Sequence, residues 1–319
     1  MAIQQHTLDT PYMVGPVHCY TTEVNDELIL FDTGPPTTAA KQYIRENIDL
    51  GRLKYIFITH CHIDHYGLAH WLEQESDAQL FIPYRDGLKI LSHEERLQDM
   101  YDLLQRLGFS GKFLEGLHQS LSTGVFPTFP KKFKIIEDDL PDHLGISYLA
   151  CPGHSQSDIV FYSDEWAVTG DVLLKGVFQS PLLDADQETG ERFKNYEAYC
   201  STIIKLSSLR DRLICPGHRK KVDSVDQTIL FYVSKMLDRT SQLKKFDRGE
   251  NVAQITRKIF GDNTKETFLL YLKASEVLFM QDFLKYPELL ENALKDTGLF
   301  DQVASLYEKA VSTPSYISH

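Results

Sequence analysis

The chain has 319 residues and a formal net charge of -12, with 33 Lys and Arg residues against 45 Asp and Glu residues. This balance argues against a general nucleic-acid-binding protein, because neutralising phosphate groups requires clustered basic side chains. With 42% apolar and 24% charged residues, the composition excludes wholesale disorder and provides material for roughly two domains.

Targeting signals are not expected. The first ten residues lack the basic segment and the apolar core of a signal peptide. No apolar run approaches the ~20 residues that a membrane-spanning helix needs. Five scattered cysteines do not resemble a disulfide framework. We therefore expect a cytoplasmic protein that has no membrane partner.

Residues 1–83 are predicted to contain short strands that end in polar residues. Apolar segments at 17–22 and 27–31 flank a turn at Asn25 and Asp26. The remaining elements predicted here are a helix at 39–47, a buried strand at 55–58, a helix at 68–75 and a strand at 79–82.

Residues 84–130 interrupt this rhythm with helical patterns at 92–107 and 111–121. They are predicted to form a helical insertion, which is either a lid over the functional site or a pair of helices that only packs on the surface. Residues 131–222 return to predicted strands at 146–151, 159–162, 166–169 and 213–215, with a helix near 196–209. The tetrapeptide Cys-Pro-Gly-His occurs at 151–154 and again at 215–218, each time after a strand, which suggests two similar halves.

Residues 223–319 are predicted to be helical throughout. Ser224 with Gln227, and later Asn263 with Glu266, have the spacing of a capping box at a helix N-terminus. The second pair precedes a long apolar helix that Pro287 is expected to stop. This region would pack on the first domain or form a homodimer.

The segment 59–67 is the strongest functional signal. It places His60, His62, Asp64 and His65 within six residues, directly after the predicted strand at 55–58. In extended backbone, His60 and His62 leave the same face, whereas a helix would point them apart. Imidazole and carboxylate groups are ligands of zinc and similar divalent metals, so the segment predicts a metal site. The alternative is a chance cluster of histidines on a loop.

Three further candidates, His154, Asp171 and His218, also follow predicted strands. The carboxyl ends of strands are where loops converge on ligand sites. Seven such side chains suit two metals better than one.

The combined pattern, His-x-His-x-Asp-His at 60–65 with the three later residues, resembles the metallo-β-lactamase superfamily over residues 1–222. The resemblance implies an α/β fold, an αββα sandwich of two related halves. Here that sandwich would carry a helical insertion at about 84–130 and a helical C-terminal region at 223–319. It implies a first metal held by His60, His62 and His154, a second held by Asp64, His65 and His218, and a bridging Asp171.

The resemblance also implies the chemistry. A hydroxide that bridges the metals would attack a carbonyl or phosphoryl centre, and Asp64 would be catalytic by moving a proton to the leaving group. The cofactors would be two divalent metal ions, with zinc expected and iron or manganese as alternatives. Asp32 stands where the family carries an acidic residue that supports the metal loop, although it could equally be a turn former. Ser155 and Asp158 are expected to orient His154.

Substrate contacts are less determined. Lys175 and Arg219 would pair with a substrate carboxylate or phosphate, unless they are simply solvated. The helical regions resemble the branch with hydroxyacylglutathione hydrolases, acyl-homoserine-lactone lactonases and quinolone-signal thioesterases, although the lactonase tyrosine has no match at 172–175.

The first hypothesis is a binuclear hydrolase of a small-molecule ester, thioester or lactone. Alternatives are a small-molecule phosphodiesterase on the same fold, a metal-bearing regulatory binding protein, and a mononuclear iron oxygenase, which the seven ligand positions disfavour.

Overall fold

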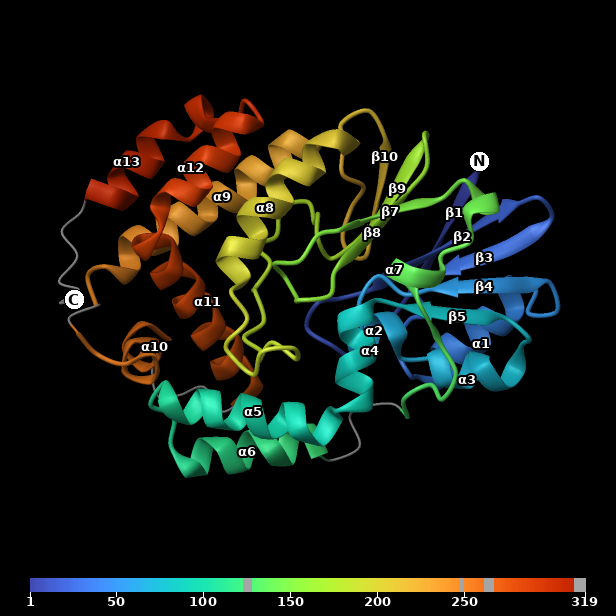
Figure 1. Cartoon of the computed structure of the whole chain (residues 1–319), viewed down its shortest axis with the longest axis horizontal. Helices are drawn as coiled ribbons and strands as arrows, with labels where there is room; N and C mark the ends of the chain where they lie inside the picture. The colour runs from blue at the N-terminus through green and yellow to red at the C-terminus, as the bar shows by residue number, and fades with distance from the viewer. Residues whose placement is uncertain (123–127, 247–248, 261–266, 313–319) are drawn as a thin grey trace.

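The computed structural model describes residues 1–122, 128–246, 249–260 and 267–312. Two β-sheets lie at the centre, and helices cover their outer faces (Figure 1). Apolar side chains of both sheets form one shared cluster, in which Phe31 of the first sheet lies 5.4 Å from Phe161 of the second, between ring centroids. The α/β class expected from the sequence is confirmed.

The first sheet has six strands in the order β1-β2-β3-β4-β5-β6. Its first three strands pair antiparallel, and β3 to β6 pair parallel. The strands are β1 Ile3–Leu8, β2 Val17–Val24, β3 Glu27–Phe31, β4 Leu53–Phe57, β5 Gln79–Ile82 and β6 Lys134–Ile135. The predicted strands are confirmed, and the edge strand β1 was not predicted.

The second sheet has four strands in the order β10-β9-β8-β7. Strands β7, β8 and β9 pair antiparallel, and β9 pairs parallel with β10. These strands are β7 Ser147–Ala150, β8 Ile159–Tyr162, β9 Trp166–Gly170 and β10 Leu213–Pro216. The strands predicted at 159–162 and 166–169 are confirmed, and they form an antiparallel hairpin.

Side chains of β4 alternate between the two faces of the first sheet, so this strand contributes to two apolar clusters. Tyr55 and Phe57 face the second sheet, and Ile56 between them faces the outer helices. Those helices are α1 Thr38–Asn47, the short α2 Ile63–Tyr66 and α3 Ala69–Glu75. The hydroxyl of Thr37 accepts a hydrogen bond from Ala40 N and caps α1.

Helices from the second half of the chain cover the outer face of the second sheet. They are α8 Asn195–Leu206, α9 Val225–Leu243, α11 Thr267–Lys285, α12 Pro287–Asp296 and α13 Ala304–Ser312, with single turns η2 Ser207–Leu209 and η3 Phe300–Gln302. Val160 and Ile214 of the sheet share one buried cluster with Ile203 of α8, Val233 of α9 and Phe279 of α11. The C-terminal helices therefore pack directly on the αββα core.

The insertion contains α4 Tyr84–Leu91, α5 His93–Arg106 and α6 Gly111–Ser122. Met100 and Leu104 of α5 share a third cluster with Val277 of α11 and Ile255 of α10 Val252–Phe260. Figure 1 shows α5 and α6 along the edge of the molecule beside α10 and α11. The insertion is thus held by the C-terminal helices as well as by the first sheet.

Some predicted boundaries differ from the structure. Pro287 does not merely stop α11; it is the first residue of α12, where its missing N–H costs nothing. The cap at Ser224 is present, with the hydroxyl accepting from Gln227 N at 3.2 Å. The pair Asn263 and Glu266 lies outside the described residues. Strand β6, helices α2 and α4, and the short α7 Ile136–Asp139 and η1 Asp142–Leu144 were not predicted. Helix α10 lies in the region expected to be helical, but it was not predicted as a separate helix.

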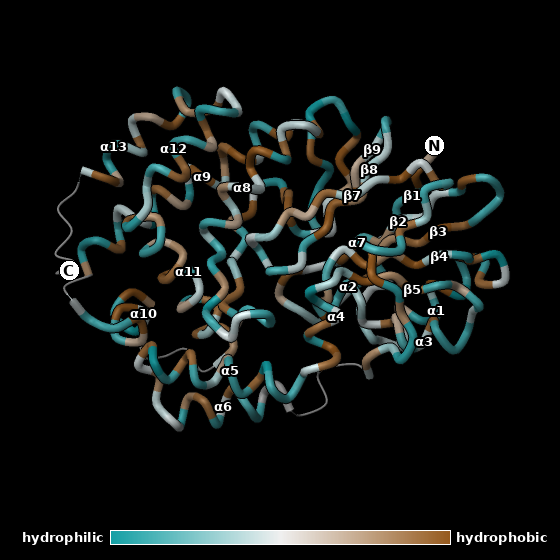
Figure 2. Tube along the Cα trace, in the orientation of Figure 1, coloured by the Kyte–Doolittle hydropathy of each residue, from teal (hydrophilic) through white to brown (hydrophobic). Residues whose placement is uncertain are grey.

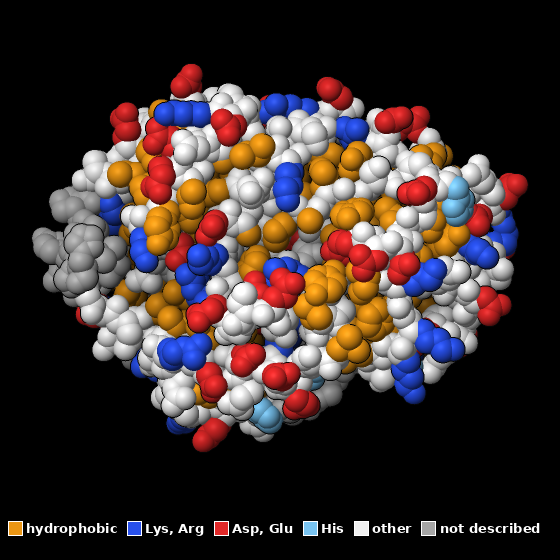
Figure 3. Space-filling view, in the orientation of Figure 1, with side chains coloured by type: hydrophobic (Ala, Val, Ile, Leu, Met, Phe, Trp, Pro, Cys, Tyr) orange, Lys and Arg blue, Asp and Glu red, His pale blue; other side chains and the backbone are white. Residues whose placement is uncertain are grey.

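Apolar residues concentrate along the central strands and on the inward faces of the helices (Figure 2). On the face drawn in Figure 3, basic and acidic side chains are interspersed rather than gathered into a single basic area. Among the helices in the described ranges, none combines the length and apolarity needed to cross a bilayer.

Candidate metal centre

The structure brings the seven predicted donors together at the carboxyl ends of strands from both sheets. His60, His62, Asp64 and His65 follow β4, and His154, Asp171 and His218 follow β7, β9 and β10 respectively. They form two groups, and within each group one donor atom per residue lies within 4.8 Å of every other. The first group is His60, His62, His154 and Asp171, and the second is Asp64, His65 and His218.

Three imidazoles converge in the first group. His62 Nδ1 lies 2.8 Å from His60 Nε2 and 3.2 Å from His154 Nε2. His62 has extended backbone just before α2, which lets it share a face with His60 as the spacing predicted.

Asp171 lies between the two groups. Its Oδ2 is 3.7 Å from His154 Nε2 in the first group. Its Oδ1 is 3.5 Å from His65 Nε2 and 3.6 Å from His218 Nε2 in the second. His218 Nε2 also lies 3.2 Å from Asp64 Oδ2. One carboxylate therefore offers an oxygen to each group.

Four of the histidines use Nδ1 to bond protein groups that lie outside the cluster. The partners of Nδ1 are Thr59 Oγ1 at 3.0 Å from His60, Asp32 Oδ2 at 2.8 Å from His65, Ser180 O at 3.1 Å from His154, and Pro16 O at 2.8 Å from His218. Carbonyl and carboxylate oxygens only accept, and the Thr59 hydroxyl donates to Asp32, so each Nδ1 carries the hydrogen. When the ring is neutral, as it is in a metal-binding histidine, each Nε2 therefore turns a lone pair toward the cluster.

The polar atoms at the centre fit a bound cation. Among the described residues, His65 Nε2, His218 Nε2 and Asp171 Oδ1 are fully buried yet have no hydrogen-bond partner. Buried polar atoms are otherwise almost always paired. Nitrogen lone pairs and carboxylate oxygens that converge without donors between them are the donor set of a divalent metal.

The pKa shifts of the donor side chains also favour a bound cation. Burial alone would lower the pKa of His65, but the carboxylates of Asp171 and Asp32 outweigh it and raise that pKa well above its usual value. Burial would raise the pKa of Asp171, but His65 and His218 hold it far below the ordinary range. By contrast, burial and neighbouring imidazoles lower the pKa of His60 and of His62. The centre thus holds ionised carboxylates whose charge a cation would balance.

A sequence profile described as the Metallo-beta-lactamase superfamily matches residues 12–218, which include all seven donors. The chain belongs to the metallo-beta-lactamase superfamily.

Two curated proteins to which this chain is similar come from Bacillus subtilis (strain 168). The probable metallo-hydrolase YqjP is 29% identical over 279 residues, which span 82% of this chain and 86% of the relative. The probable metallo-hydrolase YybB is 26% identical over 236 residues, which span 72% of this chain and 93% of the relative.

Solved structures extend the similarity to the helical regions. The metallo-beta-lactamase family protein TTHA1429 from Thermus thermophilus has a TM-score of 0.71 at 20% identity, covering 90% of this chain and 94% of that one. A beta-lactamase domain protein from Burkholderia ambifaria also has a TM-score of 0.71, at 16% identity, covering 89% of this chain and 87% of that one. At these identities the likeness shows the fold alone.

Within this metallo-beta-lactamase fold, Asp32 lies where a supporting carboxylate was expected. It follows β3 with a positive φ of 57°, and it is buried. Its Oδ1 accepts from Thr59 N at 2.8 Å, and its Oδ2 accepts from Thr59 Oγ1 at 2.9 Å and from His65 Nδ1. It therefore ties the start of the metal loop to one of the donors.

Ser155 and Asp158 shape the loop that carries His154 without touching its ring. Ser155 N donates to Asp158 Oδ2 at 2.6 Å, and Ser155 Oγ lies 3.2 Å from Ser157 Oγ. The ring of His154 is oriented by the carbonyl of Ser180. The sequence could not indicate this partner, because every residue has a carbonyl.

Lys175 and Arg219 lie at the surface of the metallo-beta-lactamase domain. Lys175 forms an ion pair with Asp223, and the Arg219 side chain is exposed. The Arg219 carbonyl accepts from His18 Nε2 at 2.8 Å, which gives His18 a structural role. A substrate contact of either basic side chain stays a prediction.

Asp86 is a further site residue that sequence reasoning missed. It is fully buried in α4, and its Oδ2 accepts from Cys61 N at 2.7 Å, between two of the donors. Its Oδ1 pairs with Lys89 Nζ at 2.9 Å. The available signal was an acidic residue in the first turn of a helix, three positions before a lysine.

Proposed function

We propose that this chain is a binuclear metal-dependent hydrolase that acts on a small-molecule ester, thioester or lactone. The position of Asp171 carries the proposal for two metals, because its two oxygens lie toward different donor groups. His60, His62 and His154 would hold one divalent metal, and Asp64, His65 and His218 the other. Zinc is the first choice, since imidazole and carboxylate donors suit it, and iron or manganese are alternatives.

Divalent metals bound there would supply Lewis-acid polarisation of the substrate and would acidify a water for attack near neutral pH. The chain supplies the proton transfer. Burial would raise the pKa of Asp64, but His218 and His65 hold it below its ordinary value. The ionised carboxylate is therefore ready to accept a proton from the attacking water and to return it to the leaving oxygen or sulfur.

A carbonyl substrate is favoured over a phosphodiester on three grounds. The chain is acidic, with a formal net charge of -12. Of the two basic side chains considered as phosphate partners, Lys175 is already paired with Asp223. The similarity to two probable metallo-hydrolases supports hydrolysis in general. The resemblance of the helical regions to hydroxyacylglutathione hydrolases, lactonases and quinolone-signal thioesterases supports the carbonyl class.

The test is elemental analysis of chain purified without chelator, followed by assays of the same sample. The substrates are a p-nitrophenyl ester, an acyl thioester, a lactone and a bis-p-nitrophenyl phosphodiester. We expect two metal equivalents per chain and faster turnover of a carbonyl substrate. Asp64→Asn should lower kcat by about 100-fold or more, since general acid–base catalysis contributes about that much. Asp138→Asn, at an exposed position, is the matched control.

Three outcomes contradict the proposal. One equivalent of iron without hydrolysis points to an oxygenase. A preference for the phosphodiester substrate changes the substrate class. Full metal occupancy with no turnover of the whole panel favours a regulatory binding protein.

A further inference from the structure

A short segment after β9 links the C-terminal helices to one of the donors. We call residues 178–183 the strap. On one side, Ser180 O accepts from His154 Nδ1 at 3.1 Å, and Leu182 N donates to His154 O at 2.8 Å. The strap therefore holds both the ring and the backbone of His154.

Helix α11 holds the strap from its other side. Ser180 Oγ donates to Glu276 Oε1 at 2.7 Å, and Leu183 N donates to Ser275 Oγ at 3.1 Å. The hydroxyl of Tyr271 donates to Leu183 O. Three residues of α11 thus contact the middle of the strap at Ser180 and its last residue, Leu183.

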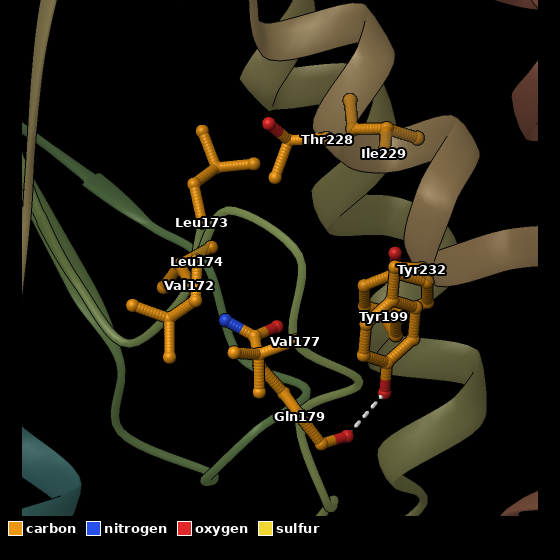
Figure 4. A pocket seen from close by; sticks show the side chains of 9 residues that line it. All are labelled: Val172, Leu173, Leu174, Val177, Gln179, Tyr199, Thr228, Ile229 and Tyr232. Carbon is orange, nitrogen blue, oxygen red and sulfur yellow. Dashed lines mark hydrogen bonds between the residues drawn. The ribbon is translucent and has the colours of Figure 1, made fainter. Parts of the chain in front are cut away.

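Helix α9 contacts the beginning of the strap. Tyr232 OH donates to Gln179 O at 2.8 Å, and the Tyr232 ring stacks on Phe178 with centroids 4.6 Å apart. Figure 4 shows Gln179 beside Tyr232 of α9 and Tyr199 of α8, around a small cavity whose walls are otherwise mainly apolar. Helical side chains therefore fix the strap on each side of Ser180.

Glu276 is the one acidic side chain among these contacts, and it is 2% exposed. Its Oε2 accepts from Arg239 Nη1 at 2.7 Å, and its Oε1 also accepts from Lys273 Nζ at 2.9 Å. The Arg239 guanidinium lies 4.2 Å from the ring centroid of Phe178 in the strap. A carboxylate is costly to bury, and here two cations balance it while it bonds Ser180.

We propose that Glu276 is a positioning residue for His154, acting through Ser180, so that the C-terminal helical region sets the cation affinity of the first donor group. The inference rests on the proposed metal-binding function. Orienting partners of metal-bound histidines commonly change metal affinity by about 10–100-fold. The effect should be confined to the group that contains His154, because the histidines of the second group are oriented by Asp32 and Pro16.

The test titrates metal-stripped full-length chain with Zn²⁺ alone, in competition with a chromophoric chelator, and repeats the titration with Co²⁺ to follow its absorption spectrum. Glu276→Ala and Ser180→Ala should each weaken one of two binding steps by about tenfold, and the double variant should lose little more, because both act on one path. Glu276→Gln keeps an acceptor for Ser180 Oγ and should restore most of the affinity. Ser180→Ala keeps the carbonyl for His154 and the Glu276–Arg239 pair, so it remains informative if Glu276→Ala does not fold.

Asp282→Asn is the matched control, because Asp282 lies on the same helix and pairs with Arg192 at 2.7 Å without contacting the strap residue Ser180. Its titration should match that of the unchanged chain. The inference is overturned if Glu276→Ala and Ser180→Ala both bind two cations with unchanged affinity. It is also overturned if Asp282→Asn weakens the same binding step equally. An unchanged chain that binds no divalent cation contradicts the proposed function itself.

Discussion

At the scale of single residues, the centre is defined by which nitrogen each histidine turns inward. His65 and His218 donate Nδ1–H to Asp32 and to the Pro16 carbonyl, and this leaves Nε2 for the cluster. These donors are therefore oriented by bonds to groups that lie outside the two donor clusters. Such preorganisation lowers the cost of ordering ligands on binding.

Asp32→Ala should weaken cation binding at the second group by about 10–100-fold. The substitution leaves His65 Nδ1–H and the Thr59 N–H without their carboxylate acceptor in a buried place. Zn²⁺ titration of the metal-stripped chain measures the change. Asp32→Asn retains one acceptor oxygen and should lose less, whereas Asp138→Ala, at the surface, should lose nothing. Two unchanged binding steps in Asp32→Ala would contradict a supporting role.

At the scale of elements, an ion pair fastens the insertion to the segment that precedes α8. The guanidinium of Arg96 in α5 contacts both oxygens of Asp184 at 2.9–3.1 Å. Asp184 also accepts from Gln156 Nε2 at 3.0 Å, two residues beyond His154. The insertion thus reaches the loop of a donor through two side chains.

Arg96→Met should destabilise the packing of α5 by about 3 kcal/mol, because it removes the cation that contacts the buried Asp184 carboxylate and leaves Lys89 as the nearest one. The Lys89 Nζ atom lies 3.9 Å from that carboxylate. Hydrogen exchange of the α5 backbone amides should become faster. Arg45→Met is the matched control, since Arg45 pairs with Glu75 at 3.0 Å with its side chain 53% exposed, and exposed pairs contribute about 0–1 kcal/mol. Equal exchange in the two variants would mean that the buried pair does not hold α5.

Strand β1 and helix α4 were not predicted because of features of their local sequence. Strand β1 begins with Ile3, Gln4 and Gln5, and its two glutamines are both exposed, so strict alternation is absent. Helix α4 contains Gly87, which weakens helix propensity, yet a Cβ there would lie 2.9 Å from Ile135 Cδ1. The close approach of α4 to Ile135 favours glycine at this position, and the glycine makes the segment look less helical in the sequence.

The candidate donors, in contrast to these elements, could be predicted from the sequence. His60 and His62 owe their roles to side-chain type and spacing, which are properties of the sequence. By contrast, the groups that orient His154 and His218 are the backbone carbonyls of Ser180 and Pro16, and these are brought into place by the fold. Sequence therefore indicates which residues bind, whereas tertiary structure decides which atoms face the site.

At the scale of the whole molecule, the centre joins the two halves of the sandwich. The donors His60, His62, Asp64 and His65 follow a strand of the first sheet, and the other three follow strands of the second. The C-terminal helices pack on the second sheet and on the insertion. A cation at the centre would therefore add a further link between loops that are already joined by the apolar core and by hydrogen bonds such as Ile159 N to Thr59 O.

Chelation should lower the thermal midpoint of the whole chain. A ligand that binds only the folded state stabilises it by RT ln(1 + [L]/Kd), which is about 4 kcal/mol at a free concentration of 1,000 Kd. Differential scanning calorimetry before and after dialysis against a chelator measures the shift, and added Zn²⁺ should restore the original midpoint. Asp171→Asn removes the negative charge shared by both groups, so its midpoint should respond less to the chelator. If elemental analysis shows that the metal has gone while the midpoint is unchanged, the centre does not link the two halves energetically.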